Sequence, residues 1–462
     1  RIIGQWINGK ITGYCLGFEG PPGIGKTSLA KKGLSCCLKD KEGNERPFSF
    51  IAMGGSSNGS TLEGHNYTYV GSTWGKVVDI LIETKCMNPI IFIDELDKIS
   101  RTEHGREIIG ILTHLVEPTQ NATFQDKYFS GIDLDLSKTL FIFSYNDAEL
   151  IDRILLDRIH RIKFENLTLE EKLVICHKFI LPEILTKMGL IDCIQFTEDN
   201  LKFIINNYTL EPGVRKLKEI LFEIISEINL EILAQNIKFD YPITFENDLL
   251  KTKYLKERHE VRIKEIPYEP KIGIMNGLWA NAMGQGGIIP IEISFYPVQN
   301  ILDLKLTGMQ GDVMKESMNV AKTLAWQLTT DERKKELVEY FKETNNQGLH
   351  IHCPEGAVPK DGPSAGTAIT VTLYSLFNNK KINNKLAITG EMNLQGKVTA
   401  IGGLDLKILG GIRAGVKTFL FPKENDKEFK KFWEKYKDNI IVEGIEFKQV
   451  DNINEVLKLV YI

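Results

Sequence analysis

The stretch Gly20-Pro21-Pro22-Gly23-Ile24-Gly25-Lys26-Thr27 fits the pattern Gly-x-x-x-x-Gly-Lys-Thr. It follows a short apolar run at residues 14–19 and precedes a helical stretch at residues 28–38. Glycines let backbone N–H groups converge on phosphate oxygens, and the following helix offers its positive N-terminus. In this pattern the lysine reaches the β- and γ-phosphates and the threonine hydroxyl binds Mg²⁺. The sequence therefore predicts that residues 20–27 bind ATP with Mg²⁺. The alternative is a fortuitous glycine turn.

A second apolar run, Ile90-Ile-Phe-Ile-Asp94-Glu95, ends in two carboxylates. Four consecutive apolar residues are typical of a buried strand. Asp94 suits the Mg²⁺ shell, and Glu95 suits orienting a water for attack on the γ-phosphate. Because strands often end in acidic residues, the pattern is weak alone. It gains weight from lying about seventy residues after the glycine loop.

Apolar runs alternate with helical stretches from residue 13 to about residue 163, which is typical of a mostly parallel sheet with crossover helices. The runs lie at residues 14–19, 89–93 and 139–144. From 167 to 235 the spacing is helical throughout, with a capping box at Thr168-Leu-Glu-Glu171 and a long amphipathic stretch at 213–233. Residues 240–270 are polar and contain prolines, so they are interpreted as a linker, after which strand-like segments return. We expect an α/β nucleotide-binding subdomain at 1–165, a helical subdomain at 166–240, a linker at 241–268 and a separate α+β domain at 269–462.

The other chemical signature is Pro359-Lys-Asp-Gly-Pro-Ser364-Ala-Gly together with Lys407. A serine nucleophile needs a base, and no His/Asp pairing near Ser364 has the spacing of a triad. Lys407 shares a helical 3/4 spacing with Leu404, Ile408 and Gly411, so it should face the apolar side of its helix. Desolvation there lowers the pKa of an ammonium group, which would make Lys407 a neutral base. A lysine that snorkels past apolar neighbours fits the spacing equally well.

Ser364 precedes residues with 3/4 apolar spacing, so it should lie at the start of a helix after a glycine-bearing loop. Free backbone N–H groups at a helix N-terminus can stabilise a developing oxyanion. The alternative is a serine that caps the helix and has no catalytic role.

Composition indicates packed domains, with 42% hydrophobic and 26% charged residues over 462 positions, long enough for about three domains. The net charge of −4 does not indicate binding to nucleic acid, although it does not exclude a local basic patch. Seven cysteines without a Cys-x-x-Cys pair favour a reducing compartment, the cytoplasm or the mitochondrial matrix. No apolar run approaches the ~20 residues needed to span a bilayer, so we expect no membrane association. The chain opens with Arg1, and we expect it to be a fragment that lacks an upstream region.

The first half of the chain resembles the AAA+ ATPase module of Lon proteases. The resemblance rests on Gly64-His-x-x-Thr-Tyr69-Val70-Gly71, on Asn88-Pro-x-x-x-x-Asp94-Glu-x-Asp-Lys98 and on Leu155-Leu-Asp-Arg158. It implies that Asn146 is sensor 1, that Arg215 is sensor 2, and that Arg158 is an arginine finger given to a neighbouring subunit's nucleotide. Either arginine could instead be a surface ion-pair partner. Tyr69 and Val70 match the pore loop that grips a translocating polypeptide, with ordinary loop packing as the alternative.

The second half resembles the Lon proteolytic domain. His350-Ile-His352 and the stretch from Pro354 to Gly366 resemble the nucleophile block, and Thr389-Gly-Glu391 with Gly402-Gly-Leu-x-x-Lys407 resembles the lysine block. By resemblance Ser364 is the nucleophile, Lys407 the general base, and Thr389 a residue that orients Lys407. Positions that match residues shaping or gating the site are Ile291, Glu292, Asp361 and His352. Departures from the family pattern are Asp405-Leu406 for Lys-Glu, Trp74 for proline, Tyr145 for serine and His114 for an acid.

The resemblance implies an AAA+ parallel-sheet core, an all-α lid and a Lon-type proteolytic domain. It further implies an ATP-dependent serine endopeptidase, assembled as a homohexameric ring, that unfolds, translocates and degrades misfolded or regulatory proteins. The competing interpretation is a remodelling AAA+ ATPase whose Lon-like domain is inactive.

Overall fold

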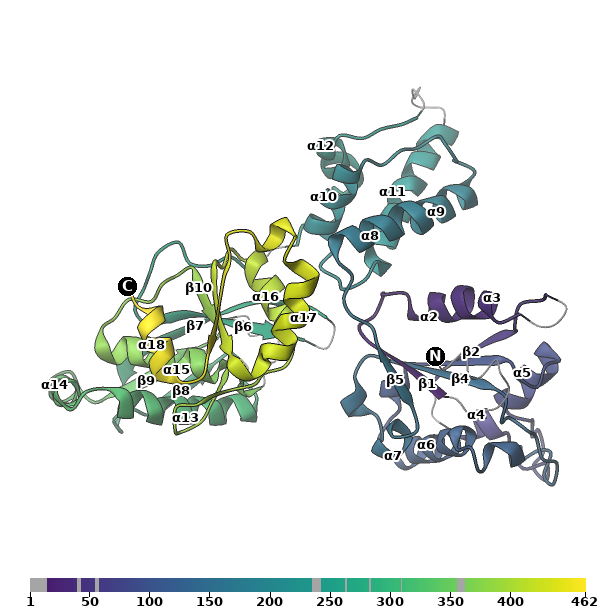
Figure 1. Ribbon diagram of the computed structural model, residues 1–462, viewed down its shortest axis with the longest axis horizontal. Coiled ribbons are helices and arrows are strands. Elements are labelled where there is room, and N and C mark those ends of the chain that lie inside the picture. The colour runs from purple at the N-terminus through teal and green to yellow at the C-terminus, as the bar shows by residue number, and fades with distance from the viewer. Residues whose placement is uncertain are drawn as a thin grey trace. The chain divides into compact units, whose positions relative to one another are not determined.

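The computed structural model describes residues 15–39, 43–54, 58–234, 242–261, 264–281, 284–308, 310–354 and 362–462. The chain divides into two compact units (Figure 1). The first comprises residues 1–261 and 282–284, and the second comprises residues 262–281 and 285–462. The expected class is confirmed, because a parallel sheet and a helical region precede a mixed sheet with helices. The expected domain borders at 165, 240 and 268 stay predictions.

The sheet of the first unit is parallel throughout the described strands, in the order β2-β3-β4-β1-β5. Its strands are β1 (Cys15–Glu19), β2 (Phe48–Ala52), β3 (Ile90–Asp94), β4 (Leu140–Tyr145) and β5 (His160–Lys163). Because parallel strands end at one edge of a sheet, the segments after β1, β3 and β4 lie together there. The three strands expected from apolar runs are confirmed. β2 and β5, the two edge strands, were not predicted. β5 has no apolar run, because it exposes His160, Arg161 and Lys163.

Helices cover this sheet, and buried side chains of β3 and β4 pack against α5 (Lys76–Thr84) and α6 (Glu103–Val116). The helix after the glycine loop runs from Lys26 to Cys37 as α2 (Lys26–Ser28), a π-helical segment η1 (Leu29–Leu34) and α3 (Ser35–Cys37). The remaining elements of this region are α4 (Ser60–Glu63), α5 (Lys76–Thr84), η2 (Leu96–Lys98), α6 (Glu103–Val116), η3 (Asn121–Thr123), η4 (Ala148–Leu150) and α7 (Arg153–Leu156).

The helical part of the first unit begins as the sequence predicts. Thr168 and Glu171 form a reciprocal capping box, in which the Glu171 N–H donates to Thr168 Oγ1 and the Thr168 N–H donates to Glu171 Oε2. The elements are α8 (Leu169–Ile175), η5 (Cys176–Ile180), α9 (Leu181–Met188), α10 (Glu198–Tyr208), α11 (Arg215–Leu233), α12 (Asn247–Leu249) and η6 (Leu250–Tyr254).

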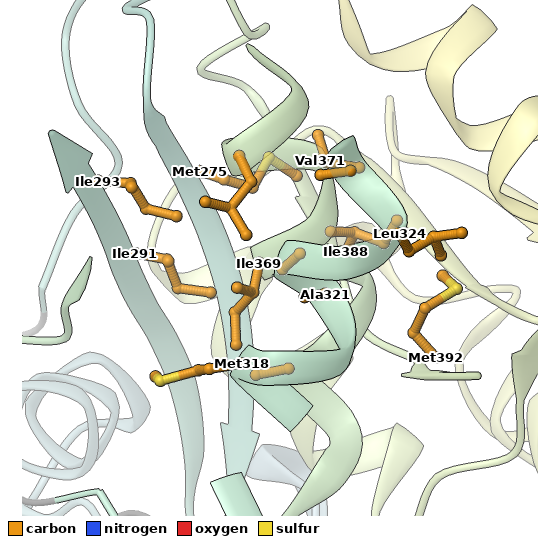
Figure 2. Close-up of a cluster of buried hydrophobic side chains, with 14 of the residues drawn as sticks. Met275, Ile291, Ile293, Met318, Ala321, Leu324, Ile369, Val371, Ile388 and Met392 are labelled. Carbon is orange, nitrogen blue, oxygen red and sulfur yellow. The ribbon is translucent and has the colours of Figure 1, made fainter. Parts of the chain in front are cut away.

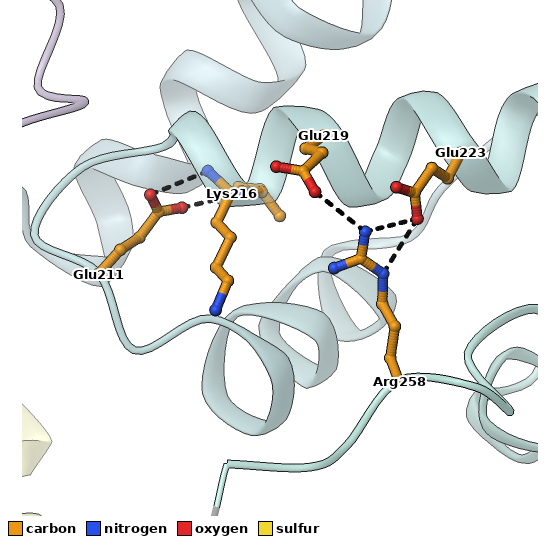
Figure 3. Close-up of polar contacts among 6 residues, drawn as sticks. Glu211, Lys216, Glu219, Glu223 and Arg258 are labelled. Carbon is orange, nitrogen blue, oxygen red and sulfur yellow. Dashed lines mark hydrogen bonds and ion pairs between the residues drawn. The ribbon is translucent and has the colours of Figure 1, made fainter.

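Hydrogen bonds and ion pairs hold α11 in place, as Figure 3 shows. The Glu211 carboxylate accepts hydrogen bonds from the backbone N–H groups of Lys216 (2.9 Å) and Leu217 (2.8 Å), which have no partner within the first turn of the helix. Farther along, Arg258 forms ion pairs with Glu219 and Glu223. The start of α11 is therefore held in place by a negative charge, which the helix dipole also favours.

Several apolar residues of the expected linker pack with the helical region. Ile243, Phe245, Leu250 and Leu255 are buried in the core of the helical region. The Asn200 side chain also donates a hydrogen bond to the Phe245 carbonyl. These apolar residues are scattered among polar and charged ones, so they form no periodic pattern in the sequence. This part of the expected linker therefore packs in the core of the helical region, and the linker assignment at 241–268 stays a prediction.

The second unit is built on a mixed sheet of order β14-β13-β10-β6-β7-β9-β8. β7 pairs antiparallel with β6 and β9, and the other pairs are parallel. The strands are β6 (Ile274–Ala280), β7 (Gly286–Pro297), β8 (Leu304–Thr307), β9 (Gln347–His352), β10 (Leu386–Ile388), β13 (Thr418–Pro422) and β14 (Glu446–Val450), with a separate hairpin of β11 (Glu391–Met392) and β12 (Val398–Thr399).

Both faces of this sheet are covered, so its central strands are apolar on both sides. Figure 2 shows one core, where Met318 and Ala321 of one helix and Ile369 of another pack against Ile291 of β7. The opposite core joins Ile288 to Ile408 and Phe432. The helices are α13 (Asp312–Leu328), α14 (Asp331–Glu343), η7 (Pro363–Ala365), α15 (Gly366–Asn378), α16 (Leu404–Arg413), η8 (Lys423–Asn425), α17 (Asp426–Tyr436), η9 (Ile440–Val442) and α18 (Ile453–Val460). Within the described ranges, no helix has both the length and the apolarity to cross a bilayer.

Candidate functional site

The glycine loop has the backbone that phosphate binding requires. Gly23 and Gly25 have φ angles of 79° and 94°, a region that favours glycine. A Cβ on Gly25 would meet no atom within 4 Å, so this face of the loop is open. The loop therefore fits a phosphate group on the evidence of its conformation and its open side.

Lys26 lies at the start of the helix that follows, with 8% of its surface exposed. Its ammonium donates hydrogen bonds to the carbonyls of Gly20 and Tyr145 (3.0 Å) and to Asn146 Oδ1 (3.1 Å). Burial lowers the pKa of Lys26 to about 8, and the charge of Asp94 opposes that shift. The structure thus brings Lys26 and Asn146 together, as the order of the strands requires.

The acidic residues after β3 are arranged by a tight turn. Asp94 ends the strand, and its Oδ1 accepts a hydrogen bond from the Glu95 N–H (3.0 Å). Glu95 has a φ of 58°, which is uncommon for a non-glycine residue. Asp97 Oδ2 accepts hydrogen bonds from the N–H groups of Asn146 (3.0 Å) and Asp147 (3.2 Å). Asp97 therefore ties this turn to the end of β4, a role that its place in the quoted motif did not reveal.

Arg215 is the first residue of α11, and its Cβ would be 3.0 Å from a Cβ on Gly23. The Val214 N–H donates to the Gly23 carbonyl (3.0 Å), so the start of this helix contacts the glycine loop directly. Arg158 behaves differently, because its Nε forms an ion pair with Glu117 (2.6 Å) at the end of α6. The structure brings Arg215 to the loop and gives Arg158 a partner within its own chain.

Tyr69 and Val70 lie on a loop between α4 and α5. Tyr69 is 70% exposed and Val70 is fully exposed, so neither side chain is buried in loop packing. This exposure argues against the alternative in which the pair serves only to pack the loop.

Ser364 lies in η7, directly before α15. Its carbonyl accepts hydrogen bonds from the Gly390 N–H (2.9 Å) and from Thr389 Oγ1 (3.4 Å). The Gly390 carbonyl in turn accepts from the Thr367 side chain (2.9 Å), so η7 is tied to the segment after β10. The residue at the N-cap of α15 is Ala365, without a side-chain cap, so Ser364 is not an ordinary capping serine.

Lys407 lies on α16 with 4% of its surface exposed, so the prediction of burial is confirmed and the snorkelling alternative is not. Desolvation lowers the pKa of Lys407 to about 8. The charge of Glu428 on α17 opposes that shift. No local pattern pointed to Glu428, since it lies on the next helix. Thr389 is fully buried, and its side-chain hydroxyl donates a hydrogen bond to the Ser364 carbonyl (3.4 Å).

Glycines let α16 approach β7 closely. A Cβ on Gly286 would be 2.2 Å from the Leu406 carbonyl oxygen, and a Cβ on Gly410 would be 2.2 Å from the Gly286 backbone. Because no side chain separates the helix from the strand here, Lys407 is carried into the interior of the domain. The burial of Lys407 therefore depends on the close backbone contacts between α16 and β7.

We expect Gly410→Ala to destabilise the second unit by about 1–3 kcal/mol, because the added methyl group overlaps backbone that cannot move alone. Chemical denaturation measures this. Gly402→Ala is the matched control, since a Cβ at Gly402 meets nothing within 4 Å. Equal stabilities of the two variants would show that α16 can shift without cost.

The other positions implied by resemblance lie apart from these contacts or outside the described ranges. Thr307 Oγ1 hydrogen-bonds His350 Nε2 (2.9 Å) and His352 Nδ1 (2.7 Å) across β8 and β9. Glu292 is opposite His352 in the β7–β9 ladder, whereas Ile291 is a core residue. Asp361 lies outside the described residues. Within the described ranges, no group of three or more His, Cys, Asp or Glu residues could hold a metal ion.

The fold and the first site define a P-loop module of the AAA class, followed by a mixed α/β domain that carries a buried lysine. Family models match in the same order along the chain. Residues 16–167 match the ATPase family associated with various cellular activities, residues 187–239 match the Lon protease AAA+ ATPase lid domain, and residues 247–462 match the Lon protease C-terminal proteolytic domain.

Curated relatives agree with these models. A Lon protease homolog of Acanthamoeba polyphaga mimivirus is 34% identical over 99% of this chain and 49% of its own length. Lon proteases of Campylobacter concisus and Finegoldia magna are 36% and 35% identical, over 92% and 99% of this chain and 52% and 55% of their own lengths. The chain belongs to the Lon protease family. It spans about half the length of the curated relatives it matches.

Proposed function

We propose that the chain is an ATP-dependent serine endopeptidase of the Lon type, which unfolds, translocates and degrades misfolded or regulatory proteins. The observation that carries the proposal is Lys407, a buried lysine whose pKa is lowered to about 8, in the domain that also carries Ser364. A neutral amine is what a serine nucleophile needs when no histidine base is available. The cofactors are ATP and Mg²⁺.

In the proposed hydrolytic step, the uncharged Lys407 Nζ accepts the proton of Ser364 Oγ as that oxygen bonds to the carbonyl carbon of a peptide. The resulting ammonium returns the proton to the leaving amine as the peptide C–N bond breaks, which leaves an acyl ester on Ser364. Water then attacks the ester, with Lys407 again accepting and returning a proton. Thr389 would act by fixing η7 through its hydrogen bond to the Ser364 carbonyl.

In the proposed nucleotide site, Lys26 and the backbone of residues 20–27 bind the phosphates, and Thr27 and Asp94 hold Mg²⁺. The metal supplies positive charge beside the phosphate oxygens. Glu95 orients the attacking water, while Asn146 and Arg215 bind the terminal phosphate. Arg158 would serve a neighbouring subunit in a homohexameric ring, which requires that it exchange Glu117 for the neighbour's nucleotide.

Tyr69 and Val70 would grip the substrate polypeptide, since an exposed aromatic–aliphatic pair can hold many side chains by apolar contact. The proposed partners are unfolded proteins and further copies of this chain. All seven cysteines are free thiols, which favours a reducing compartment such as the cytoplasm.

The function is tested by incubating the full chain with an unfolded protein in the presence and absence of ATP and Mg²⁺. We expect degradation that depends on both, by an assembly whose size corresponds to a ring. ATP hydrolysis without degradation would favour the remodelling ATPase with an inactive Lon-like domain. A serine-reactive probe separates the two, because it should label the unaltered chain and not Lys407→Ala.

The lowered pKa of Lys407 predicts how hydrolysis depends on pH. Because the neutral amine is the active form, cleavage of a small peptide should rise from pH 7 to pH 9 with a midpoint near the pKa of about 8. A peptide that needs no ATP is used, since Lys26 titrates in the same range. An activity that is flat over this range would contradict a lysine base.

A matched pair of variants checks which group sets this midpoint. The Glu428 charge raises the pKa of Lys407, so Glu428→Gln should move the rising limb to lower pH. Glutamine keeps an acceptor for the Asn425 side chain. Glu434→Gln, at an exposed position of the same helix, should leave the midpoint in place.

A further inference from the structure

Trp74 follows the loop that carries Tyr69 and lies in an aromatic cluster with two residues from a different segment. Its ring stacks on Phe129 (centroids 5.9 Å apart, 29° between planes) and meets Tyr128 edge-on (5.8 Å, 74°). Tyr128 and Phe129 also contact each other edge-on at 5.1 Å. Indole Nε1 donates a hydrogen bond to Asp79 Oδ1 (2.6 Å) on α5. The ring therefore contacts two aromatic rings and is hydrogen-bonded at its polar edge, although it is 40% exposed.

The loop with Tyr69 has a narrow neck. The His65 N–H donates to the Thr73 carbonyl (3.0 Å), which joins the two ends of residues 65–73. A Cβ on Gly64 would be 2.8 Å from the Gly75 nitrogen, so both positions need the small residue. Within the loop, the Tyr69 and Ser72 N–H groups bond the carbonyls of Asn66 and Tyr69. Trp74 directly follows Thr73 at the neck, so a movement of Trp74 would also move the loop that carries Tyr69.

The segment with Tyr128 and Phe129 is itself a closed loop. Phe124 and Leu134 exchange backbone hydrogen bonds at its base, and Gln125 bonds Asp133 (2.6 Å). It is fastened to the neck by Asp126, a fully buried carboxylate whose Oδ2 accepts from the Gly75 N–H (2.8 Å). The Lys127 N–H also donates to the Glu63 carbonyl (2.7 Å). Loop 124–134 is thus joined to the residues that flank loop 65–73, by hydrogen bonds at Glu63 and Gly75 and by the aromatic contacts of Trp74.

We propose that Trp74 is a positioning residue that fixes the Tyr69 loop to the 124–134 loop, so that force on a substrate held at Tyr69 passes into α5 and the body of the subunit. This inference rests on the proposed function. A flexible loop that carries an exposed aromatic residue would yield under load, whereas one clamped at its neck transmits displacement. The clamp should matter most when the substrate resists, that is, when it is folded.

The test compares Trp74→Ala with the unaltered full chain in degrading a stably folded protein and an unstructured one. We expect degradation of the folded substrate to slow about three- to tenfold, the range expected for losing an aromatic pair. The unstructured substrate should slow less, and a small peptide should be cleaved at an unchanged rate. The ATP consumed per folded molecule degraded should rise, which a loss of stability alone would not cause. Trp74→Phe, which keeps the stacking and loses the Asp79 bond, should be intermediate.

The chain offers a matched control in Trp433. It is 41% exposed, stacks on Phe429 (6.1 Å, 26°) and meets Phe447 edge-on (5.9 Å, 72°) in the other unit. Trp433→Ala removes an equivalent aromatic cluster and should leave the ATP cost of degradation unchanged.

Two further measurements decide between positioning and other roles. Hydrogen exchange of residues 65–73 should be faster in Trp74→Ala, and unchanged exchange would overturn the clamp whether or not the chain degrades proteins. In a Tyr69→Ala background, which removes the aromatic ring, Trp74→Ala should have a smaller effect on the unstructured substrate than it has alone. Equal effects in the two backgrounds would show that Trp74 does not act through Tyr69. An unaltered chain that hydrolyses ATP and degrades nothing would refute the proposed function instead.

Discussion

We expect Ser364→Ala to abolish peptide-bond hydrolysis and to leave ATP hydrolysis close to that of the unaltered chain. Removing a nucleophile or its base costs about a thousandfold or more, because the two groups act as one unit. The nucleotide site belongs to the other compact unit and uses none of the same residues. The measurement pairs a protein degradation assay with phosphate release on the same preparation. Degradation by Ser364→Ala at half the normal rate or more would remove Ser364 from the mechanism.

Two substitutions of Lys407 separate its possible roles. Lys407→Met removes the amine and keeps a long apolar chain in the buried position. Lys407→Arg keeps a positive charge but supplies a guanidinium that does not lose its proton in proteins. If Lys407 is the general base, both variants should be as inactive as Ser364→Ala. Activity retained by Lys407→Arg would mean that charge, rather than proton transfer, is what this position supplies. Lys417→Met, at an exposed position just beyond the same helix, is the control.

The sequence predicted features whose chemistry is local. The glycine loop and the Thr168 capping box each depend on residues no more than eight positions apart, so their patterns can be recognised in the sequence. The apolar runs of β1, β3 and β4 are legible because those strands are central in the sheet and buried on both faces. β5 lies at the sheet edge and consists mostly of exposed basic residues, so it forms no apolar run.

Features that depend on distant contacts could not be predicted. Spacing placed Lys407 on the apolar side of its helix, but its burial depends on Gly286, a strand residue more than a hundred positions earlier. Glu428, which opposes the pKa shift of Lys407, comes from the next helix. The ion pair between Arg158 and Glu117 and the Asp126 bond to Gly75 likewise join segments that no periodicity relates.

Glu95→Gln should bind ATP and fail to hydrolyse it, with a loss of about a hundredfold or more, the usual contribution of a positioned acid or base. The carboxylate lies directly against Gly54, because a Cβ on that residue would be 1.7 Å from Glu95 Oε2. Glutamine has nearly the same shape and lacks the charge, so the variant changes chemistry rather than packing. Nucleotide binding measured by calorimetry and phosphate release measured by steady-state assay are the two readouts.

Lys26→Ala provides a contrast, because Lys26 should be needed for nucleotide binding itself. Its loss should therefore abolish both nucleotide binding and phosphate release. Glu103→Gln, an exposed carboxylate at the start of α6, should alter neither. Because the proposed peptidase site lies in the other unit, Glu95→Gln should still cleave a small peptide while it fails to degrade a folded protein. Normal phosphate release by Glu95→Gln would remove this residue from the mechanism. Another group near the carboxyl end of β3, such as Asp97 in the turn that follows, would then have to orient the water.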